Sequence, residues 1–293
     1  MTLDRLPHER RVVIFTYDDA QSLDVSGPAE VFSAATRLGA GPGYVLEVVG
    51  PTASPIRTTS GLRLSVDGAI TDVAGPVDTF VVGGGEGVRA LMLDAGSIAA
   101  IVDVAGRSRR VTSVCSGAFA LAQAGLLDGR RATTHWSSCE LLASLFPRVT
   151  VDPDPIFVRD GNVATSAGVT AGIDLCLALV EEDHGRDLAL AVARQLAVFL
   201  KRPGGQSQFS AHLQVQLADR DAVAEVQTWV ADHLAENLAI ENLAARAAMS
   251  PRHFARVFRA ETGSTPARFV ERARVEAARR RLEESADGVD AVA

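Results

Sequence analysis

The sequence predicts an α/β fold in which a parallel sheet is sandwiched by helices, followed by a small all-α domain. Two observations carry this prediction. From Arg11 to about Leu200, short runs of β-branched residues alternate with longer segments rich in Ala and Leu, a pattern typical of βα units on a parallel sheet. After residue 220, the segments have the spacing of amphipathic helices. A length of 293 residues favours two domains, since a domain commonly has about 150 residues.

The elements of the α/β part follow in chain order. Buried parallel strands are apolar runs rich in Val and Ile, and the segments between them favour helices. The predicted strands are 12–17, 44–50, 79–84 and 110–115, with shorter ones at 131–134, 156–159 and 162–165. The predicted helices are 27–38, 97–106, 117–124, 136–145, 169–182 and 186–200.

Residues 201–220 interrupt this alternation and are predicted to be a linker. The segment contains Pro203, Gly204 and Gly205, followed by a run of polar residues, which is a composition typical of connections between domains. The predicted organisation is therefore an α/β domain at 1–200, the linker at 201–220, and a helical domain at 221–293.

Composition and charge exclude several classes of protein. The formal charge of −7 opposes a nucleic-acid surface over the whole chain but permits a local one. No segment is apolar over the roughly 18 residues that a membrane helix needs, and the first residues lack the features of a signal peptide, so we expect a cytoplasmic protein without membrane contact. The three cysteines, Cys115, Cys139 and Cys176, fit no disulfide or metal-ligand spacing. We expect no metal and no cofactor.

The C-terminal domain contains a predicted helix-turn-helix. A helix over 239–249 is followed by a short turn, after which Ser250 and Pro251 have the residue types of an N-cap and a first helical position. In this second helix, Phe254 and Phe258 are four residues apart and face inward. The outward positions are Arg252, Ala255, Arg256 and Arg259. Arginine reads guanine edges and also binds phosphates, so this face is a candidate DNA-binding surface.

The charge of this domain differs from that of the whole chain. Between Asn242 and Leu282 there are ten Arg and three Glu, so ten minus three leaves a local excess of seven positive charges. Such an excess fits a surface that faces phosphates. The alternative is a small helical bundle whose arginines are only solvated, since basic amphipathic helices are common.

The C-terminal residues also carry a family resemblance. The run LAARAAMSPRHFARVFRAETGSTPARFVERARVEAARRRLEES resembles the first helix-turn-helix and the connecting helix of the AraC family of transcription regulators, over about residues 221–285. The resemblance implies that Arg252, Ala255 and Arg256 face the bases. That family carries a second such subdomain, and the sequence GVDAVA stands where it would begin. A truncated product and a protein with a single helix-turn-helix both stay open.

Cys115 ends a predicted strand and is followed at once by Ser116, Gly117 and a helix. A cysteine on such a strand-to-helix turn has the setting of a nucleophile elbow. The helix N-terminus is expected to lower the thiol pKa below its usual value of about 8.5, and the amides after Cys115 are candidates for binding an oxyanion. Gly84 and Gly85, at the end of another predicted strand, are further candidate backbone donors.

The α/β half carries a second resemblance, in four segments. They are LDVSGPAEVF, VVGGGEG, VCSGAFALAQAGLLDGRRATTHW and VRDGNVATSAGVTAGIDLCLALV. Over nearly all of residues 10–200 the chain resembles the PfpI-type class I glutamine amidotransferase-like superfamily, whose fold is flavodoxin-like, and isocyanide hydratases are especially similar across the second half. The resemblance implies an elbow cysteine at Cys115, an acidic partner at Asp24, a histidine at His135, and oxyanion donors near Gly85 and Ser116.

Together, the two halves are similar to the GlxA group of AraC-type regulators. This similarity implies that the α/β domain senses a small amine or amino-acid metabolite. A pocket lined by carboxylates prefers a cation or a hydrogen-bond donor over an anion. The candidate ligand-binding residues are Asp24, Glu30, Gly84, Gly85, Cys115 and Ser116.

Each candidate catalytic residue also has a structural alternative. Cysteine is among the most buried residue types, so Cys115 is either a nucleophile or part of the core. Asp24 lies just before a predicted helix and is either the partner of Cys115 or a helix cap. His135 is either a general base or the cap of the helix that begins at Trp136.

Two functions therefore compete. A ligand-responsive regulator, which binds DNA and forms a homodimer through the α/β domain, is favoured by Arg252 and Arg256, for which a pure enzyme has no use. A cysteine-dependent hydratase or hydrolase, acting on a small nitrogen-containing molecule, is favoured by Cys115, Asp24 and Ser116. The fold is shared by both classes and does not decide between them. We favour the regulator.

Overall fold

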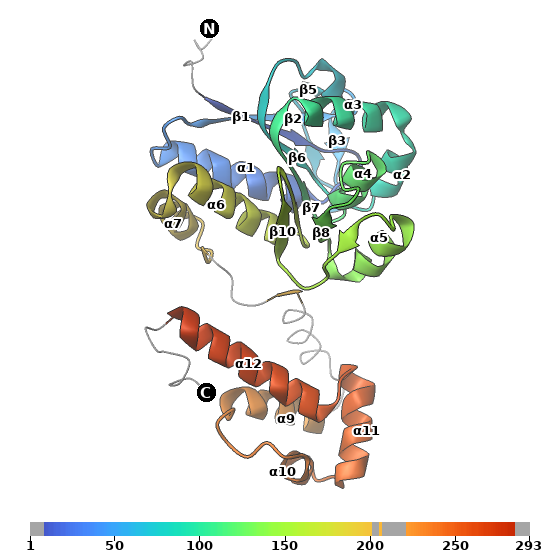
Figure 1. Ribbon diagram of the computed structural model, residues 1–293, viewed down its shortest axis with the longest axis vertical. Coiled ribbons are helices and arrows are strands. Elements are labelled where there is room, and N and C mark those ends of the chain that lie inside the picture. Colours follow the sequence, from blue (N-terminus) through green and yellow to red (C-terminus); the bar gives the residue numbers. More distant parts are fainter. Residues whose placement is uncertain (1–8, 201–204, 207–220, 285–293) are drawn as a thin grey trace. The chain divides into compact units, whose positions relative to one another are not determined.

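Figure 1 shows the computed structural model of the chain, which describes residues 9–200, 205–206 and 221–284. The chain divides into two compact units between Arg202 and Pro203, called here the α/β unit and the helical unit. The predicted linker at 201–220 lies outside the described residues, apart from Gly205 and Gln206.

The α/β unit is built on a seven-stranded sheet with the strand order β10-β11-β7-β6-β1-β2-β5. All neighbouring strands in this order are parallel except β10 and β11. Its strands are β1 (Arg10–Phe15), β2 (Tyr44–Gly50), β5 (Gly68–Ala69), β6 (Val77–Val82), β7 (Ser108–Val114), β10 (Phe157–Asp160) and β11 (Val163–Ser166). Two short pairs lie outside it, β3 (Ile56–Arg57) with β4 (Arg63–Leu64), and β8 (Arg131–Ala132) with β9 (Thr150–Val151).

Helices cover both faces of the sheet, so the predicted α/β class is confirmed. Strand β1 shows why: Val12 and Ile14 belong to one core cluster, whereas Val13 and Phe15 belong to the other, because successive side chains of a strand point to opposite faces. The first cluster also contains side chains of α1 (Ser22–Arg37), α6 (Ala171–His184) and α7 (Arg186–Gln195). The second contains side chains of α2 (Val88–Leu93), α3 (Ala95–Gly106), α4 (Gly117–Gln123) and α5 (Cys139–Leu145).

Several predicted element ends are wrong, and left-handed residues explain three of them. Helix α6 begins two residues after the predicted start because Val169 has a φ of +45°, outside the α region. Helix α7 ends at Gln195 rather than at residue 200, since Ala197 has a φ of +54°. Strand β7 ends at Val114 and leaves Cys115, also at +54°, on the turn. Helix α2 and the strands β3, β4, β5 and β9 were not predicted.

Helix α1 begins five residues before its predicted start. The pair Gly27 and Pro28 suggested the start, since proline favours the first helical position, but Pro28 lies inside α1. Asp24 is therefore within the first turn, and the N-cap position belongs to Gln21. The Asp24 carboxylate bonds instead to a distant loop, so the interpretation of Asp24 as a helix cap is wrong.

The helical unit contains α9 (Asp221–Asp232), α10 (Ile240–Arg246), α11 (Pro251–Thr262) and α12 (Pro266–Glu284). Phe254 and Phe258 of α11 are buried with ring centroids 5.3 Å apart, and Phe258 also meets Phe269 of α12 edge-on. This confirms their predicted inward orientation. The same core cluster contains Val226 of α9 and Leu243 of α10, so α11 packs against α10 and α12 in a core to which α9 also contributes.

Within the described ranges, none of the helices has the length and apolar character that crossing a bilayer demands. The same residues contain no group of three or more His, Cys, Asp or Glu side chains placed to hold a metal ion. All three cysteines are free, and Cys139 and Cys176 are buried.

Candidate functional site

The first candidate site lies where β7 leads into α4, at the carboxyl end of a parallel strand, which is where open α/β sheets bind ligands. Cys115 occupies this turn with a left-handed backbone, a conformation that costs free energy for a non-glycine residue. Its amide donates to the Ala167 carbonyl at 3.0 Å. Its carbonyl accepts from the Thr134 hydroxyl at 2.7 Å. Two neighbouring loops therefore hold the predicted elbow conformation.

Asp24 and the glycine loop after β6 form the other side of this site. The Asp24 side chain is fully buried, and its Oδ2 accepts from the Gly84 amide at 3.0 Å. A Cβ atom at Gly84 would lie 2.6 Å from the Ser116 amide nitrogen and 2.9 Å from Asp24 Oδ2. Only glycine therefore fits between Asp24 and Ser116, and the structure brings these predicted residues together.

Burial dominates the electrostatics of the Cys115 site. It raises the pKa of Asp24 to about 7, against the opposing effect of the Gly84 hydrogen bond. It also raises the pKa of Cys115 to about 11, and the Asp24 charge adds to this shift. The predicted lowering of the thiol pKa is wrong, because loss of hydration outweighs the donors at the start of a short helix. At neutral pH, the thiol is protonated and Asp24 is divided between its two forms.

The backbone donors near the thiol differ in part from those predicted, because the Ser116 amide is among them and the Gly84 and Gly85 amides are not. The Gly85 amide donates to Ser116 Oγ at 2.8 Å, and the Ser116 hydroxyl donates back to the Gly85 carbonyl at 3.0 Å. The Gly84 amide is taken by Asp24. The prediction of Gly85 as a free oxyanion donor is therefore wrong for this structure. The amides that favour the thiolate are those of Ser116 and Val169.

Two residues of this site were missed in the sequence. Tyr17 is buried, and its hydroxyl donates to the Gly83 carbonyl at 3.0 Å. Burial and the charges of Asp24 and Cys115 raise its pKa well above the usual range. Its position at the end of the first predicted strand was a usable signal, since carboxyl ends of parallel strands share one edge. Nothing in the sequence indicated that the Val169 amide lies near the Cys115 thiol. Valine disfavours the left-handed conformation that this residue adopts.

His135 has the geometry of a cap. Its Nδ1 lies 2.7 Å from Ser137 Oγ and accepts from the Ser137 amide at 3.4 Å, at the start of a single 3₁₀ turn. A Cβ atom at Gly168 would lie 2.1 Å from His135 Cδ2, so the ring packs against the loop before α6. Burial lowers the pKa of His135. In the part of the chain that the structure describes, no hydrogen bond joins His135 to Cys115.

Glu30 lies outside the Cys115 site. Its side chain is exposed, with an oxygen 3.7 Å from an Arg37 guanidinium nitrogen. Glu30 is six positions after Asp24, which places the two side chains about 120° apart around α1. The structure does not bring Glu30 together with Asp24 and Cys115, because α1 turns this side chain to solvent.

The second candidate site is the outer face of α11. Ser250 Oγ accepts from the His253 amide at 3.3 Å, and Gly263 ends the helix with a φ of +70°. Ser250 is therefore the N-cap of α11, and Gly263 terminates the helix. The predicted DNA-facing positions are all outside the core: Arg252, Arg256 and Arg259 are exposed, and Ala255 is half-buried. None of these three arginines has an acidic partner among the described residues.

Comparison with known proteins assigns both units. Residues 10–182 match the DJ-1/PfpI family, and residues 243–293 match a helix-turn-helix domain. Isonitrile hydratase from Pseudomonas putida is 39% identical over 181 residues, which are 61% of this chain and 75% of that protein. A crystal structure of a THiJ/PfpI family protein from Pseudomonas syringae has a TM-score of 0.60 and 28% identity, covering 68% of this chain and 80% of the other.

A regulator matches a longer part of the chain. The HTH-type transcriptional regulator CdhR from Pseudomonas aeruginosa is 31% identical over 247 residues, which are 83% of this chain and 71% of that protein. An alignment of this length exceeds the α/β unit, so it extends into the helical unit. The chain therefore belongs to the DJ-1/PfpI family, in the group that joins this domain to an AraC-type helix-turn-helix domain.

Proposed function

We propose that the protein is a DNA-binding transcriptional regulator that responds to a small metabolite in its α/β unit. The single observation that carries this proposal is the outer face of α11, where Arg252, Arg256 and Arg259 are exposed without acidic partners. The whole chain is acidic, with a net charge of −7, yet these arginines have no acidic partner in the described ranges. The opposite face of α11 packs into the core of the helical unit. Such a helix fits the major groove of DNA, where arginine pairs with guanine.

The test is DNA binding by the full chain. A duplex selected from a random pool should bind more tightly than an unselected duplex, and Arg256→Ala should cost about 1 to 3 kcal/mol on the selected duplex and much less on the other. Arg186→Ala, at an exposed arginine of α7, is the control for a general loss of charge. Equal losses on both duplexes would contradict base reading by Arg256.

The proposed effector is a small amine or an amino-acid-like molecule bound beside Cys115. Asp24 Oδ1 is buried without a hydrogen-bond partner, and an ammonium group satisfies such an acceptor best when the carboxylate is charged. Since the pKa of free Asp24 is about 7, binding of an ammonium group should tighten as pH rises from about 5 to 8.

Isothermal titration calorimetry with a panel of small amines measures this effect. Proton release on binding should be seen at pH 6, and Asp24→Asn should abolish both the release and the dependence on pH. Binding that weakens with rising pH would contradict the amine assignment.

We also propose that the protein acts as a cytoplasmic homodimer that associates through the α/β unit. Contact with DNA implies the cytoplasmic location. One helix-turn-helix reads only a short half-site, and a symmetric dimer doubles the length that is read. Light scattering on the full chain, and on Met1–Arg202 as a separate fragment, tests whether the α/β unit carries the association.

A second candidate function is hydration of an isonitrile, favoured by the 39% identity with isonitrile hydratase and by the pair of Asp24 and Cys115. A carboxyl group with a pKa of about 7 is suited to moving a proton at neutral pH. Loss of an added isonitrile, abolished by Cys115→Ala, would support this activity. No turnover above the rate of the Cys115→Ala variant would leave the regulator as the function of this site.

A further inference from the structure

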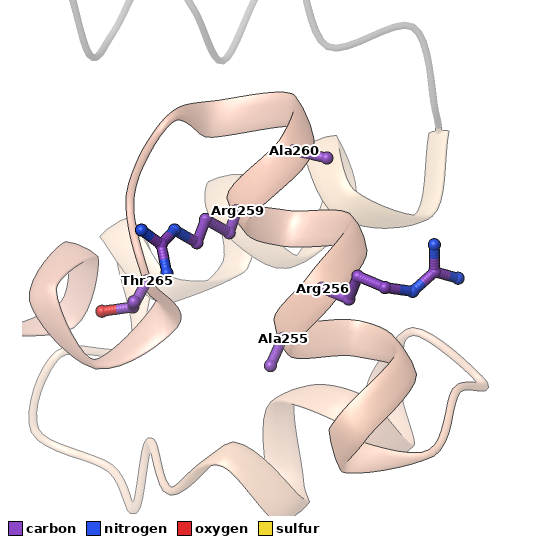
Figure 2. Close-up of a pocket in the computed structure, with 5 residues that line it drawn as sticks. All are labelled: Ala255, Arg256, Arg259, Ala260 and Thr265. Atoms are coloured by element: carbon purple, nitrogen blue, oxygen red, sulfur yellow. The ribbon is translucent and has the colours of Figure 1, made fainter.

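A shallow hollow lies beside α11 in the helical unit. Its volume is about 500 Å³, and its lining residues are Ala255, Arg256, Arg259, Ala260 and Thr265 (Figure 2). The two alanines flank the two arginines along α11 and add little bulk to its surface. A compact group can therefore approach the helix closely at this position.

The two arginines of the hollow extend in different directions. Figure 2 shows the Arg259 side chain extending toward Thr265, whereas the Arg256 guanidinium points away from it. Arg256 is also bonded to His253, whose Nδ1 lies 3.1 Å from a guanidinium nitrogen and which is nearer the start of α11. The structure thus separates the two cations, although their positions in the sequence are only three apart.

The hollow is positively charged. No acidic side chain is among its lining residues, and in the described part of the chain Arg259 has no acidic partner. Arg268, in the first turn of α12, is exposed, and its amide donates to Thr265 Oγ1 at 3.4 Å. The first turn of α12 contains no acid. A guanidinium group and a hydroxyl with an unused donor hydrogen are partners suited to a phosphate.

We propose that this hollow seats one backbone phosphate of DNA, bound by the Arg259 guanidinium and the Thr265 hydroxyl, while Arg256 reads a base edge. The inference rests on the proposed function and assigns different roles to two arginines of one face. Phosphate contacts set the position of a recognition helix on the duplex, and base contacts supply the sequence preference. Arg259 is therefore a positioning residue of the recognition helix.

The first experiment measures affinity of the full chain for the selected and unselected duplexes by fluorescence anisotropy over a series of salt concentrations. Arg259→Ala should weaken both duplexes by the same factor and reduce the slope of log affinity against log salt by about 0.9, the value for one lost phosphate contact. Arg259→Lys keeps the charge and should keep most of the slope. An unchanged slope in Arg259→Ala, or a loss confined to the selected duplex, would overturn the assignment.

A matched pair of variants tests the hollow itself. Ala260 is an exposed lining residue, so Ala260→Glu and Ala260→Gln introduce side chains of equal size that differ only in charge. Ala260→Glu should strongly lower the affinity for both duplexes, and Ala260→Gln should lower it only slightly. Equal losses would show that size rather than charge matters, and would contradict a phosphate in the hollow. Circular dichroism should show the same helix content in every variant.

A third experiment uses inorganic phosphate to distinguish a DNA phosphate from a free ion, because the two have the same chemistry. Replacing chloride by millimolar phosphate at constant ionic strength should leave duplex affinity unchanged. Competition that disappears in Arg259→Ala would show that free phosphate and the duplex use the same hollow, whereas phosphate that binds at Arg259 without any change in duplex affinity would assign the hollow to the free ion and overturn the inference. If the wild type binds neither duplex, the proposed function fails as well; if it binds both and Arg259→Ala keeps the full salt slope, only the inference fails.

Discussion

The Cys115 site and the outer face of α11 differ in how their ionisable groups are exposed to water. Asp24 and the Cys115 thiol are removed from water, and burial is the largest cause of both pKa shifts. The arginines of α11 stay in water, and no acid among the described residues neutralises them. Burial keeps the Cys115 thiol protonated and Asp24 only partly ionised at neutral pH, whereas the outer face of α11 presents exposed arginines to water.

The proposed function assigns a different kind of recognition to each site. A buried acceptor such as Asp24 Oδ1 has a high cost when unpaired, so a ligand with a matching donor gains selectivity. Exposed arginines gain affinity mainly from the charge of DNA and depend on salt. Four predictions test the contrast, in order of expected size.

The largest expected effect concerns Asp24→Asn and the pH dependence of stability. An unfolded Asp has a pKa of about 3.9, and the folded value is about 7. Between these values the folded protein holds a proton that the unfolded chain has released, so the unfolding free energy of the wild type should fall as pH rises from about 4 to 7, by up to about 4 kcal/mol. Asp24→Asn should lack this fall. Urea unfolding at pH 4.5, 6 and 8 measures the unfolding free energy of the wild type and of Asp24→Asn. The same dependence on pH in the two proteins would contradict the burial argument.

The next effect concerns the close packing of the turn before α4. A Cβ atom at Gly117 would lie 2.3 Å from the Val82 carbonyl oxygen, so Gly117→Ala should destabilise the α/β unit by about 3 kcal/mol, although alanine is the better helix former. The control is Gly106→Ala at the end of α3, where no atom lies within 4 Å of the new carbon. Urea unfolding should show little change or a small gain for this control. A similar loss in both variants would mean that packing at the turn is not the cause.

A smaller effect concerns thiol reactivity. With a pKa of about 11, the thiolate fraction of Cys115 at pH 7 is about 300 times lower than that of a free thiol, and the greater nucleophilicity of a basic thiolate restores about tenfold. Labelling by iodoacetamide should therefore be about 30 times slower than that of glutathione. Peptide mass spectrometry should still find Cys115 labelled before buried Cys176, whose pKa burial raises to about 12. Labelling at the rate of glutathione would contradict the burial argument.

The smallest effect concerns the helical unit, where a local cap supports α11. Ser250→Ala removes the acceptor of the His253 amide and should lower stability by about 1 kcal/mol, whereas Ser250→Asp should retain the cap. Arg252→Ala, on the exposed face, should change stability by less than about 0.5 kcal/mol. Thermal unfolding followed at 222 nm measures all three variants. A larger loss for Arg252→Ala than for Ser250→Ala would show that the arginine face supports the fold.

The sequence alone determined the architecture and the recognition helix, because both depend on local signals. Alternation of β-branched runs with helical segments predicted the layered sheet, and Ser250 with Gly263 fixed the ends of α11 through bonds to residues a few positions away. The inward pair of Phe254 and Phe258 followed from helical spacing, and so did the outward arginines. In these places, residues a few positions away in the sequence are enough to set the conformation of the chain.

Tertiary structure decided the chemistry of the Cys115 site. Asp24, Gly84 and Ser116 are remote in sequence and meet only when β1, β6 and β7 lie side by side. The direction of the Cys115 pKa was predicted incorrectly, and the sequence indicated neither the occupied Gly85 amide nor the exposure of Glu30. All three depend on how much water and which partners surround a group after folding, and a desolvation cost is set by atoms from the whole unit rather than by neighbours in the chain.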